Sequence, residues 1–102
     1  MNLNRSMTSS VYAVYKDKVL LHRHKKYNLL FPLGGSMDSC EVPHKTAIRE
    51  VLEESGLQID LYNKDDNFEL GRVVQLYTPM HILLENVGHE VESIDFIFLQ
   101  RR

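Results

Sequence analysis

The sequence predicts a small α+β domain with one helix and several short strands, and three observations carry this prediction. Apolar residues recur at helical spacing in one segment only, Pro43–Ser55, which a proline opens and a glycine follows. The other apolar residues fall in short runs rich in β-branched and aromatic residues, separated by polar breaks. The length of 102 residues is that of one small unit, so we expect residues 1–102 to form a single domain.

The composition excludes several classes of protein. Hydrophobic residues make up 43% and charged residues 25% of the chain, and the formal net charge is −2. This balance argues against a protein that binds nucleic acid through bulk electrostatics, and no apolar run approaches the roughly 20 residues of a membrane span. The single cysteine, Cys40, cannot form an internal disulfide, and residues 1–10 are polar, so we expect a cytoplasmic protein.

Seven segments have the composition of strands. They are residues 11–15, 19–24, 29–33, 57–61, 72–78, 80–84 and 93–99. The first two flank the polar stretch Lys16-Asp17-Lys18, so we expect them to form an antiparallel hairpin. The third runs into Gly34-Gly35, where we expect the chain to turn sharply.

The predicted helix carries a group of carboxylates that helix stability does not explain. Its apolar residues share one side, and Glu50, Glu53 and Glu54 lie within about 100° of one another on the opposite side. Like charges at these spacings destabilise a helix by a few tenths of a kcal/mol per pair. These charges also lie in the C-terminal half, where the helix dipole disfavours anions. A divalent cation explains the placement, because Mg²⁺ takes carboxylate oxygens and bridges them to phosphate oxygens.

Three residues close to this cluster fit the same interpretation. Arg49 precedes the first carboxylate, and a guanidinium can fix the orientation of a carboxylate through two parallel hydrogen bonds. Glu41 lies just ahead of the helix. Gly35 has no side chain, so its backbone can come close to a ligand or metal.

These residues together match a known motif. The segment from Gly35 to Leu57 reads G, five residues, E, seven residues, then R-E-U-x-E-E-x-G-U with U aliphatic, and all nine defined positions agree. It therefore resembles the box of the Nudix (MutT-like) hydrolases. The resemblance implies a mixed β-sheet sandwiched by helices, with the box as a loop–helix–loop. It also implies hydrolysis of a phosphoanhydride bond in a nucleoside diphosphate linked to another group.

The resemblance assigns roles to the residues of the box. Glu50, Glu53 and Glu54 would bind Mg²⁺ or Mn²⁺ with help from the carbonyl of Gly35, and Glu41 would be a further ligand or a salt-bridge partner. The metal would polarise the phosphoryl oxygens and activate the attacking water.

Arg49 would orient a carboxylate of the box, so that Glu50, Glu53 and Arg49 form the implied catalytic set. Outside the box, Arg23 and Lys25 lie near the end of a predicted strand, and we consider them candidates for binding the phosphates of a nucleotide substrate.

The chain departs from the family pattern in several places. A proline often precedes Gly34, and here Pro32 stands one residue earlier, with Leu33 between. Cys40 stands where a glycine is frequent, and Val42 stands where a serine or threonine usually caps the helix. Family domains usually run some 130 residues or more and continue into a second helix, whereas this chain stops at Arg102. We therefore expect a domain that lacks the C-terminal helix and leaves one sheet face bare, which the partner copy in a homodimer could cover.

Two other classes of function stay open on the sequence alone. One is a catalytically weak or inactive Nudix-like module that binds a nucleotide or a protein, and the other is an interaction domain that dimerises through its exposed sheet face. Candidate substrates include nucleoside triphosphates, oxidised nucleotides, ADP-ribose, dinucleoside polyphosphates and nucleotide sugars. Glu85, Glu90 and Glu92 are either ordinary loop charges or the source of a general base.

Overall fold

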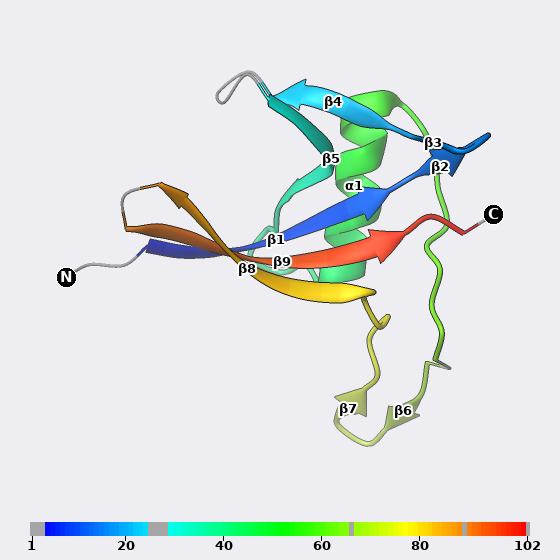
Figure 1. Cartoon of the computed structure of the whole chain (residues 1–102). Coiled ribbons are helices and arrows are strands. Elements are labelled where there is room, and N and C mark those ends of the chain that lie inside the picture. Colours follow the sequence, from blue (N-terminus) through cyan, green and yellow to red (C-terminus); the bar gives the residue numbers. More distant parts are fainter. Residues whose placement is uncertain (1–3, 25–28, 66, 89, 102) are drawn as a thin grey trace.

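The computed structural model describes residues 4–24, 29–65, 67–88 and 90–101. Its centre is one five-stranded mixed sheet with the order β4-β5-β1-β9-β8 (Figure 1). The five strands are β1 (Asn4–Tyr12), β4 (Leu21–His24), β5 (Leu29–Ser36), β8 (His81–Gly88) and β9 (Val91–Leu99). Strands β1 and β9 run parallel and the other neighbours are antiparallel, so the predicted α+β class with a mixed sheet is confirmed.

The helix α1 (Pro43–Ser55) has the bounds that the sequence predicts. Val42 occupies the N-cap and supplies no side-chain hydrogen bond, as the missing serine or threonine implies. Gly56 ends the helix in the left-handed conformation, with a φ of 76°, and its N–H donates to the carbonyl of Leu52. Cys40 has no positive φ, so replacing the usual glycine costs no backbone strain there.

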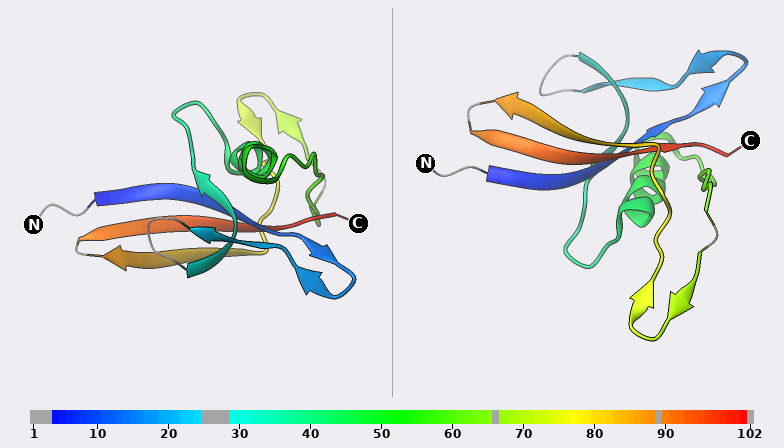
Figure 2. Two further views of the ribbon diagram at one scale, coloured as in Figure 1. Left: turned by 90° about the horizontal axis from the view of Figure 1, so that it is seen from above. Right: turned by 60° about the horizontal axis from the view of Figure 1, so that its bottom comes forward.

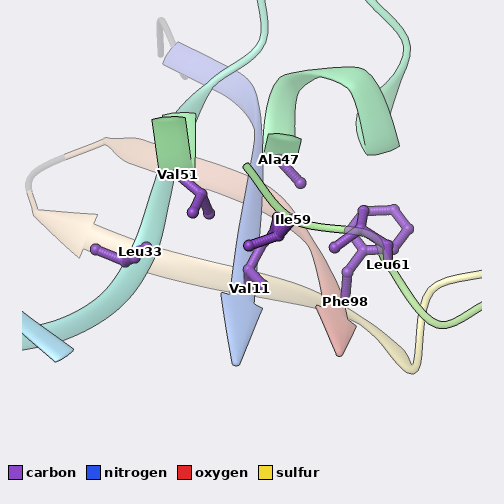
Figure 3. Close-up of a cluster of buried hydrophobic side chains, with 7 residues drawn as sticks. All are labelled: Val11, Leu33, Ala47, Val51, Ile59, Leu61 and Phe98. Atoms are coloured by element: carbon purple, nitrogen blue, oxygen red, sulfur yellow. The ribbon is translucent and has the colours of Figure 1, made fainter. Parts of the chain in front are cut away.

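The helix lies on one face of the sheet, and the core fills the space between them (Figure 2). Ala47 and Val51 project from α1 toward Val11 of β1, Leu33 of β5 and Phe98 of β9. Two residues of the segment after the helix complete the cluster, as Figure 3 shows: Ile59 and Leu61. Within the described residues α1 is the only helix, and it is too short to cross a membrane.

The first strand begins earlier than predicted. It starts at Asn4 rather than at Val11, and its polar half pairs in parallel with β9, from Asn4 opposite Val91 to Tyr12 opposite Leu99. Hydrogen bonds to the neighbouring strand, rather than an apolar pattern, therefore define this half of β1.

The predicted hairpin forms only at its tip. There β2 (Val14–Tyr15) pairs with β3 (Lys18–Val19), and the turn residues Lys16 and Asp17 have φ values of 49° and 63°. Beyond the tip the two arms separate, because β4 pairs with β5 while β1 lies between β5 and β9.

Two other predicted strands differ from the structure: one does not form, and the other is much shorter than predicted. Residues 57–61 form no strand, and only Leu61 makes an isolated bridge, to Gln100. Of residues 72–78, only β7 (Val73–Val74) is a strand, and it pairs with β6 (Glu69–Leu70) in a small hairpin that projects away from the main sheet. The apolar residues at 59 and 61 are buried against the helix and sheet, so they enter the core without joining a ladder.

The Gly34-Gly35 pair does not turn the chain. Strand β5 continues through both glycines to Ser36, and Gly34 lies opposite Ser10 of β1. A Cβ atom at Gly34 would lie 2.1 Å from the carbonyl oxygen of Ser9. The glycine is therefore needed for the close approach of two strands rather than for a turn.

Candidate active site

Arg49 and Glu41 form the central contact of the site. The Nε atom of Arg49 donates to Oε2 of Glu41 at 2.7 Å, and Nη2 donates to Oε1 at 3.0 Å. Glu41 also accepts hydrogen bonds from the N–H of Asp38 and the hydroxyl of Thr46, both at 2.9 Å. The hydrogen bond from Arg49, followed by that from the Asp38 backbone, lowers the pKa of Glu41 to about 2. Arg49 therefore ties the loop before α1 to the helix.

The same guanidinium reaches two carboxylates of the helix. Its Nη1 atom donates to Oε1 of Glu50 at 3.0 Å and lies 3.2 Å from both carboxylate oxygens of Glu53. Its Nη2 atom also donates to the carbonyl of Ser36 at 3.0 Å. The hydrogen bond to Glu41 raises the pKa of Arg49 above its ordinary value, so this group stays charged at any working pH.

Glu50 packs against the backbone of Gly35. A Cβ atom on Gly35 would lie 2.5 Å from the carboxylate carbon of Glu50, so a side chain there would displace this group. Burial raises the pKa of Glu50; the Arg49 charge opposes the rise and the charge of Glu54 adds to it. A bound cation would counteract both burial and the charge of Glu54, the two causes that raise the pKa of Glu50.

Glu54 is held by the neighbouring strands. The N–H of Gly34 donates to its Oε1 at 2.9 Å, and Nε2 of His22 in β4 lies 3.2 Å from its Oε2. Glu53 is the most open of the three helix carboxylates, with a side chain that is 57% exposed. The contact between Glu54 and His22 was not predictable from the sequence, since the two residues lie on different elements far apart in the chain.

The donor chemistry fits a hard divalent cation. Three carboxylates share one side of α1, and the backbone of Gly35 lies against the first of them. As placed, no three acidic, histidine or cysteine side chains of the described residues converge tightly enough to hold an ion. Contacts with Arg49, His22 and the N–H of Gly34 oppose the mutual repulsion of these carboxylates.

The other predicted site residues lie elsewhere. Arg23 follows His22 in β4, so its side chain leaves the strand on the opposite side. Lys25 lies outside the described residues. Glu85 and Glu92 belong to strands rather than to a loop, and Arg5 binds Glu92 at 2.8 Å.

Comparison with known proteins identifies the family of this chain. Residues 5–101 match the family model of the NUDIX domain. The crystal structure of a NUDIX-family hydrolase from Clostridium perfringens shares 38% sequence identity with this chain at a TM-score of 0.78, over 96% of this chain and 69% of that one.

Two more distant structures share the fold. The E. coli ORF135 protein has 12% identity and a TM-score of 0.67, over 98% of this chain and 63% of its own. The C. elegans Ap4A hydrolase has 16% identity and a TM-score of 0.57, over 96% and 68%.

The chain belongs to the NUDIX family, because the family model covers residues 5–101 and the fold is similar to that of a NUDIX-family hydrolase. It is a Nudix hydrolase, of the general class that acts on compounds of the nucleoside diphosphate type.

Proposed function

We propose that this protein is a Mg²⁺-dependent pyrophosphohydrolase that cleaves the phosphoanhydride bond of a nucleoside diphosphate linked to another group. Glu50, Glu53 and Glu54 would hold the ion, with Mn²⁺ as a substitute, and Gly35 would contribute its carbonyl. The ion supplies charge that stabilises the phosphoryl oxygens and lowers the pKa of the attacking water.

The single observation that carries this proposal is the arrangement around Arg49. One guanidinium contacts Glu41, Glu50 and Glu53 at 2.7–3.2 Å and so holds the box carboxylates on one side of the helix. Their mutual repulsion raises the pKa of Glu50 further, which is unfavourable for a purely structural cluster. In this proposal Glu41 acts as the salt-bridge partner of Arg49 rather than as a direct ligand, since its two oxygens already accept four hydrogen bonds.

The test is phosphate or pyrophosphate release from a panel of nucleotides with and without Mg²⁺. The variant Glu53→Gln removes one carboxylate charge at an exposed position, and we expect it to lower kcat by roughly 100-fold or more. The matched control is Glu69→Gln in the projecting β6–β7 hairpin, which should keep full activity. If Glu53→Gln retains the wild-type rate, the metal assignment is wrong.

Three further assignments remain proposals. We propose that residues 1–102 act as one domain, that the protein works in the cytoplasm, and that two copies associate. We expect the second copy to cover the sheet face turned away from α1, on which the exposed Leu83 of β8 lies beside Asp95 of β9. Sedimentation at micromolar concentration tests the association, and a monomer at all concentrations would contradict it.

A further inference from the structure

A second cavity lies where the β2–β3 hairpin comes near the residues that follow β9, at the end of the molecule that carries the C-terminus (Figure 2). Its volume is about 720 Å³, which is in the size range of sites for small-molecule ligands. The described residues that line it include none of the box carboxylates. The cavity is therefore separate from the proposed metal site.

The walls of this cavity are largely apolar. Val14 of β2 and Val19 of β3 lie directly opposite each other in the hairpin, so their side chains share one face, and both line the cavity. Leu20 continues this wall, and Leu57 lines the cavity from the segment that follows α1. The residues Val19, Leu20 and Leu57 are 46%, 39% and 47% exposed. An apolar ligand in the cavity would therefore remove considerable apolar surface from water.

The charged residues that line the cavity are all cationic. They are Lys16, Lys18 and Arg101, and no acidic residue is among the described residues of the lining. The chain as a whole has 14 acidic and 12 basic residues and a formal net charge of −2, so this local excess of positive charge does not reflect the composition. Asp17 lies in the turn between the two lysines but does not line the cavity. The cavity therefore favours an anionic group.

Backbone hydrogen bonds hold both sides of the cavity in place. On the hairpin side, the N–H of Leu20 donates to the carbonyl of Ala13 at 2.9 Å, and both residues line the cavity. On the other side, the N–H of Arg101 donates to the carbonyl of Asp60 at 2.8 Å. The fold itself thus brings the apolar wall and the cationic groups together, and a ligand has little backbone to order when it binds.

We propose that this cavity binds a long-chain carboxylate, taken up as a free monomer. The hydrocarbon chain would lie against Val14, Val19 and Leu57, and the carboxylate would lie near Lys18 and Arg101. A guanidinium can hold a carboxylate through two parallel hydrogen bonds, and a lysine adds a second charge. The apolar residues line a cavity rather than an extended outward face, so they fit one chain better than the surface of a bilayer. The proposal does not depend on the proposed hydrolase activity.

The first test is calorimetry of the full chain with octanoate, decanoate and dodecanoate, each below its micelle concentration. We expect saturable binding of one molecule per chain, with an affinity that rises by about 3–10-fold for every two methylenes added. Dodecyltrimethylammonium has the same chain with the opposite charge, and it should bind roughly 10-fold or more weakly than dodecanoate. Equal binding of the two would overturn the proposal even if no variant could be prepared.

Two sets of variants separate the charges from the apolar wall. The double variant Lys18→Gln/Arg101→Gln should weaken the binding of dodecanoate by about 3–20-fold, whereas Lys64→Gln, at an exposed position outside the cavity, should not. Val19→Thr keeps the shape of the side chain and should weaken binding by about 3–10-fold. Val74→Thr, at an exposed position in β7, is its matched control and should bind as the wild type does.

The outcomes also separate this proposal from the proposed function. If the cavity variants bind dodecanoate as tightly as their controls, the carboxylate site is wrong. Binding to vesicles of anionic lipid without binding of the monomer would also overturn it, and would indicate a membrane-binding surface instead. Neither result bears on the hydrolase assignment, which the Glu53→Gln variant tests.

Discussion

Substitution of Gly34 by alanine should disrupt the contact between β5 and β1 on which the site is built. Gly34 has a φ of 156°, and an added Cβ would lie 2.1 Å from the Ser9 carbonyl oxygen and 2.8 Å from the Ser10 Cα atom. Both atoms belong to backbone, which cannot rotate away as a side chain would. The strands must therefore separate locally, which also moves the N–H that binds Glu54.

The size of the effect follows from two separate terms. Holding an alanine at an unfavourable φ costs on the order of 1–3 kcal/mol. Separating two packed backbones adds an overpacking cost of about 1–3 kcal/mol or more. We therefore expect Gly34→Ala to lower the free energy of unfolding by about 3–5 kcal/mol, which is at the upper end for single substitutions.

A second glycine of the chain separates the two terms. Gly88 has a φ of 150°, close to that of Gly34, and apart from its chain neighbours an added Cβ there would meet no described residue within 4 Å. Gly88→Ala should therefore lower the free energy of unfolding only by the cost of the unfavourable φ, without the overpacking cost. Urea denaturation of both variants measures the difference, which we expect to be about 1–3 kcal/mol in favour of Gly88→Ala. If the two variants unfold at the same urea concentration, the close strand contact at Gly34 does not exist as described.

Three further predictions concern the box. Gly35→Ala should leave stability close to that of the wild type but lower kcat, because the added Cβ meets the movable Glu50 carboxylate rather than backbone; equal kcat would contradict this contact. Glu50→Gln should raise the melting temperature in EDTA at pH 7, since burial raises the folded-state pKa of Glu50 and its ionisation therefore opposes folding; a clear fall would indicate a structural carboxylate. The pKa of Glu41 is lowered to about 2, so its contribution to stability is present above pH 4.5 and is lost as the pH falls toward 2. Glu41→Gln should therefore reduce the loss of stability between pH 4.5 and pH 2 in denaturation experiments, and an unchanged loss would refute this reasoning.

The helix and its carboxylate face were predictable because they depend on neighbours in the sequence. The start at Pro43, the stop at Gly56 and the common side of Glu50, Glu53 and Glu54 follow from a regular 3.6-residue period. The pairing of Arg49 with Glu41 was also foreseeable, since only eight residues separate them and the box places both at the start of the helix.

Strand pairing was less predictable because it joins segments that are distant in the chain. Nothing in the polar residues 4–10 marks a strand, and only the backbone of β9 makes them one. The turn expected at Gly34 failed for the same reason, because a glycine can serve either a turn or a close approach, and the approaching strand is not visible in the sequence.

The polar groove on the five-stranded sheet that His22 of β4 and Asp95 of β9 line shows most clearly what tertiary structure decides. Asp95 breaks the apolar alternation of β9, and this signal in the sequence could have marked it as special. Its partners Thr8 and Ser10 come from the other end of the chain, and His22 joins the groove to Glu54. The sequence by itself determined the box helix and the class of hydrolase, because local spacing defines both. Which face of the sheet adjoins the carboxylates, and which polar groups lie buried there, depended on the packing of distant strands.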